Sequence, residues 1–186
     1  MSVPEILLLI GLAVALTVVA LYNRLVRLRN GSENAWSDID VQLKRRHDLV
    51  PNLVETVKGY AAHEQTTLSK VIEARNRAAQ AGGPEKRAAA EGDLSRTLSS
   101  LFALAESYPQ LKANENFLSL QRDLGSIEDA IQNARRYYNA VVRDLNTSCE
   151  TFPSNLVAGT FGFSKKEYFE LESDAERSVP SVHFAT

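Results

Sequence analysis

An uncharged apolar stretch near the amino terminus limits what this chain can fold into more than any other feature. Residues 6–22 read ILLLIGLAVALTVVALY, 17 residues without a charged side chain. As a helix rising about 1.5 Å per residue, this stretch together with Val3 and Pro4 nearly crosses a hydrocarbon core of roughly 30 Å. A secretory signal peptide is the alternative, but residues 1–5 hold no basic side chain and residues 21–24 offer no small residues for cleavage. We therefore interpret the stretch as an uncleaved transmembrane anchor.

The charges beside the stretch predict its orientation. Arg24, Arg27 and Arg29 follow it closely, whereas no Lys or Arg precedes it. Under the positive-inside rule, the chain after these arginines lies in the cytoplasm and the amino terminus lies outside. Tyr22 and the three arginines are predicted to lie at the membrane interface, where anionic headgroups attract the arginines.

Charge and cysteine content narrow the classes of protein that the sequence allows. The chain holds 21 Lys and Arg against 23 Asp and Glu, a formal net charge of −2. It therefore lacks the excess of basic side chains that is typical of a nucleic-acid-binding protein. Its single cysteine, Cys149, cannot form an internal disulfide and fits a reducing compartment, with intermolecular pairing left open. The part beyond the anchor, about 160 residues, suffices for one domain with a real core.

Beyond the anchor, apolar residues recur at three- and four-residue steps, which predicts an all-α domain. The first helix carries Trp36, Ile39 and Leu43 on one face and can continue directly from the anchor, with Asn30–Gly31 as its local weakness. A second helix is expected to start near Pro51, with Asp48 as a cap, because proline suits a first turn and disfavours a helix interior. Its apolar face is expected to comprise Leu53, Val57, Tyr60, Leu68 and Val71.

Two further helices are delimited by turn and cap signals. Residues 81–84, Ala-Gly-Gly-Pro, form the clearest loop, and Pro109 is expected to end the helix that follows it. Asn114 is expected to cap the last helix, which runs to about Ser148. Apolar residues form a stripe along each of these helices, which predicts an antiparallel four-helix bundle of up-and-down topology. A coiled-coil oligomer through the last helix is the alternative. The predicted stripes are Leu94, Leu98, Leu101, Ala105 and Tyr108, then Phe117, Leu124, Ile127, Ile131, Ala134, Tyr138, Val141 and Leu145.

The composition changes after residue 151, where aromatic residues and glycines gather. We expect an ordered but irregular C-terminal tail whose aromatic side chains pack on the bundle or on a partner. The predicted organisation is therefore an anchor and juxtamembrane segment at residues 1–29, a cytoplasmic helical bundle at 30–151 and the tail at 152–186. The tail aromatics are Phe152, Phe161, Phe163, Tyr168 and Phe169.

The run at residues 34–64, NAWSDIDVQLKRRHDLVPNLVETVKGYAAHE, resembles the signature of the LemA family. The resemblance continues through residues 68–75, 108–113, 128–139, 152–155 and 161–163, and so covers nearly the whole chain. It implies a single-pass protein of the bacterial inner membrane, with its amino terminus outside and a cytoplasmic four-helix bundle. The family's biochemical activity is not established, and relatives are associated with membrane organisation, including magnetosome membranes, and with stress proteins.

The sequence predicts no catalytic centre. His47, His63 and His183 lack the spacing of metal ligands, and Gly82–Gly83 lacks the pattern of a phosphate-binding loop. Cys149 lies on the apolar seam of the last helix, where thiols are usually inert. We therefore expect no catalytic residue, no metal, no cofactor, no small-molecule substrate and no nucleic-acid partner.

A polar group at helix-spaced positions is the main candidate for a site. Glu128 and Arg135 are seven residues apart on one helix face, from which they can meet neighbouring helices. Such a network either pairs helices and fixes their register or lines a groove for a partner, and the structural interpretation is favoured. The candidates are Asp38, Asp40, Arg46, Asn52, Glu55, Glu128, Arg135 and Asn139.

These observations favour a non-enzymatic scaffold or adaptor that is tethered to the membrane and presents its bundle to a protein partner, in membrane organisation or envelope stress. A self-associating, membrane-shaping protein is the alternative. An unrecognised hydrolase has the lowest weight, because acid–base chemistry needs groups within hydrogen-bond reach and the sequence does not place any there.

Overall fold

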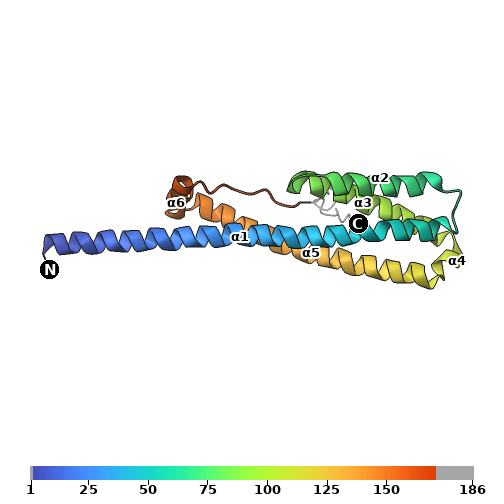
Figure 1. Cartoon of the computed structure of the whole chain (residues 1–186), viewed down its shortest axis with the longest axis horizontal. Coiled ribbons are helices and arrows are strands. Elements are labelled where there is room, and N and C mark those ends of the chain that lie inside the picture. The colour runs from blue at the N-terminus through green and yellow to red at the C-terminus, as the bar shows by residue number, and fades with distance from the viewer. Residues whose placement is uncertain (1, 171–186) are drawn as a thin grey trace, which may run out of the picture. The chain divides into compact units, whose positions relative to one another are not determined.

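The structure, a computed structural model, describes residues 2–170 and is helical throughout its regular parts (Figure 1). The described residues contain no strand, so the all-α prediction is confirmed. The helices are α1 (Val3–Lys58), α2 (Gln65–Gln80), α3 (Pro84–Glu106), α4 (Pro109–Lys112), α5 (Glu115–Glu150) and α6 (Ser154–Phe161).

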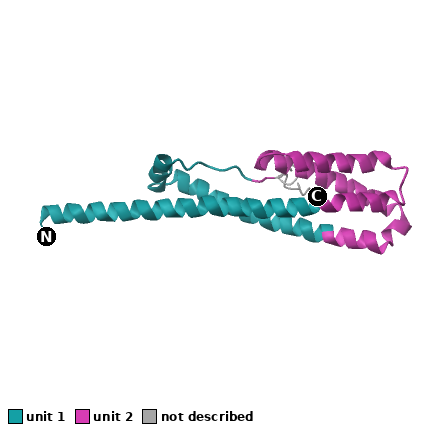
Figure 2. Cartoon of the chain, in the orientation of Figure 1, with its two compact units in different colours: residues 1–46, 124–168 teal, residues 47–123, 169–186 magenta. Residues whose placement is uncertain are grey.

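The chain divides into two compact units, coloured separately in Figure 2. Of the described residues, unit 1 comprises 2–46 together with 124–168, and unit 2 comprises 47–123 together with 169–170. Helices α1 and α5 each contribute to both units, since the division follows contacts in space. The sequence-based division at residues 29 and 151 follows composition along the chain and stays a prediction.

Unit 2 holds the up-and-down arrangement. The end of α1, then α2, α3 and the start of α5 alternate in direction, with the short α4 before α5 (Figure 1). Their inward faces carry the predicted apolar stripes, which exclude water and supply the main stabilisation of such a bundle. The buried core of this unit includes Val50, Leu53, Val57, Leu68, Val71, Ala74, Leu94, Leu98, Leu101, Leu111, Phe117 and Phe169.

Unit 1 is an antiparallel pairing of α1 with α5. The rings of Trp36 and Tyr138 lie 5.4 Å apart, and nearer the amino terminus Leu25 shares a buried cluster with Leu145. Partner numbers on α5 rise as those on α1 fall, which is the mark of antiparallel helices. Gly31 of α1 faces α5, since an added Cβ would lie 3.5 Å from Val141 Cγ1.

Helix α1 runs without a break from the apolar stretch into the helical domain. It is the one helix of the described chain that is long and apolar enough to cross a membrane, and none of its most apolar 18-residue window is buried. A core helix of a water-soluble protein would bury that window. The helix also passes through Asn30–Gly31, so the anchor continues directly into the first helix of the domain, which the sequence had left open.

The expected helix start near Pro51, with Asp48 as its cap, is wrong. Pro51 lies inside α1, which continues to Lys58, and Asp48 is an exposed mid-helix residue. Proline supplies no N–H, so the carbonyl of His47, four residues earlier, loses its helical donor. Arg75 of α2 replaces it, because its Nε donates to that carbonyl oxygen at 3.1 Å.

The expected second helix is therefore divided between α1 and α2. The turn after Lys58 is held by the N–H of Ala61, which donates to the carbonyl of Val57 at 2.9 Å. Of the stripe predicted for one helix, Leu53 and Val57 lie on α1, whereas Leu68 and Val71 lie on α2. Tyr60 falls in the turn and is 40% exposed.

The later boundaries follow the sequence signals. Gly83 adopts a φ of 77°, which favours glycine, and Pro84 begins α3. Pro109 follows the end of α3, as predicted. Asn114 caps α5, since its Oδ1 accepts a hydrogen bond from the N–H of Phe117 at 3.0 Å.

The tail is less irregular than expected. Residues 154–161 form α6, which ends where Gly162 adopts a left-handed conformation and the N–H of Phe163 donates to the carbonyl of Ala158 at 2.9 Å. Glycine permits that conformation without strain and so stops the helix cleanly. Residues 171–186, including His183, lie outside the described residues.

Candidate functional site

An ion pair joins α1 and α5 inside unit 1. Arg46 is 2% exposed, and its Nη1 lies 2.5 Å from Oε1 of Glu128, whose side chain is 35% exposed. A buried guanidinium needs such a partner, because an unpaired charge in a low-dielectric interior is strongly unfavourable. Of the eight polar candidates from the sequence, the structure brings these two together.

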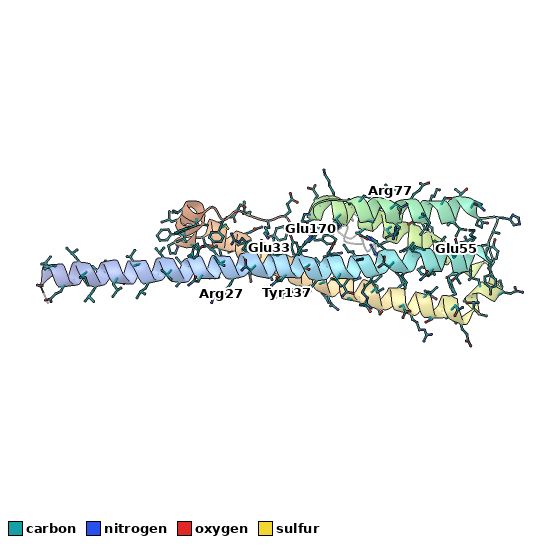
Figure 3. All side chains as sticks on the ribbon, viewed as in Figure 1. Arg27, Glu33, Glu55, Arg77, Tyr137 and Glu170 are labelled. Atoms are coloured by element: carbon teal, nitrogen blue, oxygen red, sulfur yellow. The ribbon has the colours of Figure 1, made fainter. Side chains whose placement is uncertain are left out.

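The other candidates are distributed over both units. Asp38 and Asp40 are exposed on α1, while Arg135 and Asn139 are half-buried on α5. Asn52 and Glu55 belong to unit 2 and are also exposed; Glu55 (labelled in Figure 3) pairs with Lys58 of its own helix at 3.3 Å. A partner groove lined by these residues stays a prediction.

The sequence analysis missed a buried pair in unit 2. His47 Nε2 lies 2.8 Å from Oε1 of Glu91, and both residues are buried. A signal was present, because Glu91 lies in the apolar stripe between Ala88 and Leu94, and His47 lies in the stripe between Leu43 and Val50. A polar residue at a core position of a helix requires a partner from another helix.

Polar side chains of α5 hold the chain that follows α6. The side-chain amide of Asn146 donates to the carbonyl of Lys166 and accepts from the N–H of the same residue, both at 2.9 Å. Tyr138 donates its hydroxyl to the carbonyl of Glu167 at 2.8 Å, and burial together with the Glu167 charge raises the pKa of that phenol. Lys166 in turn pairs with Glu33 of α1, labelled in Figure 3, at 3.2 Å. These contacts fix residues 166 and 167 along α1 and α5.

An apolar and aromatic site lies where α6 meets α1 within unit 1. The ring of Tyr22 makes edge contacts with Phe161 and Phe163, at centroid distances of 4.9 and 5.7 Å. Arg29 places its guanidinium 5.3 Å from the centre of the Phe163 ring, a cation–π contact. Beyond this aromatic cluster, an open groove of about 480 Å³ runs between the apolar stretch of α1 and α6.

The predicted interface residues surround that cluster. Tyr22, Arg24, Arg27 and Arg29 are all exposed at the end of the apolar stretch, and Arg27 is labelled in Figure 3. Their placement at a membrane interface stays a prediction. Of the tail aromatics, Phe169 is buried and Phe163 is half-buried, whereas Phe152 is 77% exposed.

The described residues hold no group of three or more His, Cys, Asp or Glu side chains placed to bind a metal ion. His63 is exposed in the turn after α1, apart from the buried His47. Cys149 is half-buried, and the pKa of its thiol is raised, first by burial and then by the neighbouring charge of Glu150.

Comparison of the sequence with those of known proteins finds several similar chains. The chain is 25% identical over 180 residues to magnetosome protein MamQ 2 of Paramagnetospirillum magneticum, a match that covers 83% of this chain and 66% of that protein. It is 25% identical to magnetosome protein MamQ of Magnetospirillum gryphiswaldense, covering 82% and 66% respectively. Protein LemA of Metamycoplasma hominis is 29% identical over 157 residues, with 83% and 71% covered. The chain thus spans just under two thirds of the length of the MamQ proteins.

A family model extends the match through the helical domain. The model of the LemA family matches residues 35–184, which include the helical residues from Ala35 of α1 to the end of α6. The sequence resemblance found at residues 34–64 is therefore confirmed. The chain belongs to the LemA family.

Proposed function

We propose that this chain is a membrane-anchored, non-enzymatic scaffold or adaptor that presents its helical domain to a protein partner at the cytoplasmic face of the bacterial inner membrane. The observation that carries the proposal is α1, a single helix from Val3 to Lys58 that begins as the apolar stretch and ends in the core of unit 2. A tether of this kind has no flexible linker between anchor and bundle.

The flanking charges support the cytoplasmic orientation. Arg24, Arg27 and Arg29 are exposed after the apolar stretch, and the segment before it carries no basic side chain. Positive charge next to a span retains that side in the cytoplasm.

Orientation is tested with single cysteines in a Cys149→Ser background. Ser2→Cys places a thiol before the span, and Val41→Cys places one on a position of α1 that is 53% exposed. In spheroplasts, a membrane-impermeant maleimide is expected to label Ser2→Cys, and to label Val41→Cys only after permeabilisation. The reverse pattern would overturn the orientation.

The adaptor role is tested with a photo-reactive amino acid at Val41 of the full-length protein in its native membrane. Val41 lies one helical turn from Asp38, so both residues share a helix face. A near-stoichiometric cross-linked protein is expected, with a yield that falls in Asp38→Ala and is unchanged in the control Glu73→Ala, an exposed residue of unit 2. Saturable turnover of a defined substrate by the purified protein would contradict the non-enzymatic part of the proposal.

The similarity to MamQ proteins, whose names place them with magnetosomes, favours membrane organisation as a second candidate function. In that case Val41 would cross-link only to a second copy, and the purified full-length protein would oligomerise and deform liposomes. Monomeric protein that leaves liposomes unchanged would exclude this candidate.

A further inference from the structure

The segment that contains α6 is an uncharged excursion of the chain. Residues 151–164 hold no charged side chain, although charged residues are frequent on both sides. The excursion begins after Glu150 and ends at Lys165, and Oε1 of Glu150 lies 2.7 Å from Nζ of Lys165. The ion pair between Glu150 and Lys165 therefore joins the two ends of an uncharged segment, residues 151–164.

The excursion exposes large apolar side chains. Phe152, Leu156 and Phe161 are 77%, 61% and 54% exposed, which is comparable to large side chains in the apolar stretch of α1, such as Leu8 at 69%. Of its four hydroxyl groups, three are bonded locally, since Thr151, Ser154 and Thr160 donate to the carbonyls of Thr147, Thr151 and Leu156. Exposed apolar side chains with internally bonded hydroxyls suit a hydrocarbon environment rather than water.

The position of α6 fixes its depth if α1 spans the bilayer. One wall of the 480 Å³ groove is made by α1 residues from Ile10 to Leu21, and the other by Phe152, Pro153, Leu156 and Val157. Because the apolar stretch barely reaches across a bilayer of roughly 30 Å, nearly all of it must lie in hydrocarbon. Whatever packs against residues 10–21 lies at the same depth.

Contacts with Tyr22 indicate which part of the α6 segment would lie nearest the surface of the bilayer. Phe161, at the end of α6, touches Tyr22, whereas Val157, one turn earlier, lies in a buried cluster with Leu25, against which Val18 and Leu21 pack. Tyr22 is the expected interfacial residue, and aromatic rings favour that level. From Tyr22 to Ile10 the helix rises about 18 Å, which is more than half of the hydrocarbon thickness.

We propose that α6 is embedded in the membrane beside α1, and that lipid acyl chains fill the groove between the two helices. The proposal rests on the membrane anchoring by α1 proposed above and adds a second element in contact with lipid. Lipid is the occupant because the groove is continuous with the lipid-facing surface of α1. Its one α1 hydroxyl, that of Thr17, donates to the carbonyl of Ala13 at 2.9 Å and so has no free donor for a polar ligand.

The test measures the surroundings of nitroxide labels on the full-length protein in vesicles of phosphatidylethanolamine and phosphatidylglycerol. Single cysteines are placed in a Cys149→Ser background, with helical content checked by circular dichroism. Phe152→Cys, just before α6, and Leu156→Cys, within it, report on the α6 segment and line the groove; Val14→Cys reports on the span, and Val41→Cys is the exposed control. Two positions in the α6 segment keep the test valid if one label disturbs the fold.

Collision with oxygen, which concentrates in lipid, is compared with collision with a water-soluble nickel chelate. At Phe152→Cys and Leu156→Cys we expect an oxygen-to-nickel ratio close to that at Val14→Cys and several-fold above that at Val41→Cys. If Val14→Cys is in lipid but both α6 labels match Val41→Cys, α6 is in water and the inference fails while the anchor stands. If Val14→Cys also matches Val41→Cys, the anchor itself fails. Labels on α6 that neither reagent reaches would mean that protein covers the groove, which overturns lipid as the occupant.

Discussion

At the scale of single residues, the interior proline of α1 shows how a side chain repairs a backbone defect. Pro51 removes one helical hydrogen bond and leaves the carbonyl of His47 without its normal donor. Arg75 supplies the replacement, at 3.1 Å, from the neighbouring helix. The defect thereby becomes a link between α1 and α2.

This arrangement predicts coupling between Pro51 and Arg75. Arg75→Met should lower the free energy of unfolding by about 1 kcal/mol, the usual worth of one hydrogen bond. In a Pro51→Ala background the alanine N–H bonds the carbonyl itself, so the same substitution should cost much less. Urea unfolding of the four proteins in detergent gives the coupling, with the exposed Arg77→Met as control. Equal costs in both backgrounds would contradict the repair role.

The buried pair of unit 2 predicts a larger effect. Glu91→Leu leaves Nε2 of the buried His47 without the carboxylate that lies 2.8 Å away, and should destabilise the protein by about 1–3 kcal/mol. The double variant His47→Leu with Glu91→Leu removes both polar groups, so it should be less destabilised than the sum of the single variants. Simple additivity in denaturant unfolding would show that the two side chains do not depend on each other.

The thiol of Cys149 offers a prediction about pH. Burial and the charge of Glu150 raise its pKa, whereas Lys165 lowers it. The thiolate is the reactive form, so alkylation of the folded protein should reach half its maximal rate at a higher pH than alkylation of the denatured protein. Glu150→Gln removes a negative neighbour and should move this midpoint to lower pH. A midpoint that rises, or does not move, would argue against the assigned cause.

At the scale of elements, the packing of α1 against α5 at Gly31 does not require glycine. A methyl group there would meet Val141 Cγ1 at 3.5 Å, an ordinary van der Waals distance. Gly31→Ala should therefore stabilise α1 by up to about 1 kcal/mol, because glycine is the poorer helix former. Gly125→Ala, which meets no atom within 4 Å, is the matched control and should stabilise α5 similarly. A fall in melting temperature for Gly31→Ala alone would mean that the two helices cannot accommodate the methyl group.

The helices that sequence signals delimit well are those whose ends depend on local chemistry. Asn114 caps α5 through its own side chain, and Pro84 and Pro109 begin helices by their own geometry, so each could be predicted from the sequence. Pro51 misled the prediction because its tolerance depends on Arg75, a residue 24 positions away in the chain. Local preference cannot reveal a donor that tertiary packing supplies.

The candidate site was predicted less completely than the fold, for the same reason. Arg46 and Glu128 were chosen by helix spacing, but their contact depends on the antiparallel register of α1 with α5. The pairing of His47 with Glu91 was overlooked, although both interrupt apolar stripes. The spacing of apolar residues could not predict a role for the exposed apolar face of α6. That role follows from the position of α6 against the apolar stretch of α1, which depends on the fold.

At the scale of the whole molecule, two neighbouring residues of α1 serve different units. Arg46 pairs with Glu128 inside unit 1, and His47 pairs with Glu91 inside unit 2. Each unit thus has its own buried polar link, in addition to its own apolar core. Local opening in proteins follows such cooperative units, and hydrogen exchange measures it.

Substitutions at these two positions should therefore change exchange in different parts of the chain. Arg46→Met leaves Glu128 without its 2.5 Å partner and should speed amide exchange mainly in residues 32–46 and 124–148, about tenfold for each 1.4 kcal/mol of lost local stability. His47→Leu should instead speed exchange mainly in α2 and α3, because the buried Glu91 loses its contact with the His47 ring. Hydrogen exchange with mass spectrometry on the full-length protein in nanodiscs resolves these segments. If both variants speed exchange equally in both units, the chain opens as one cooperative body and the two links stabilise it jointly.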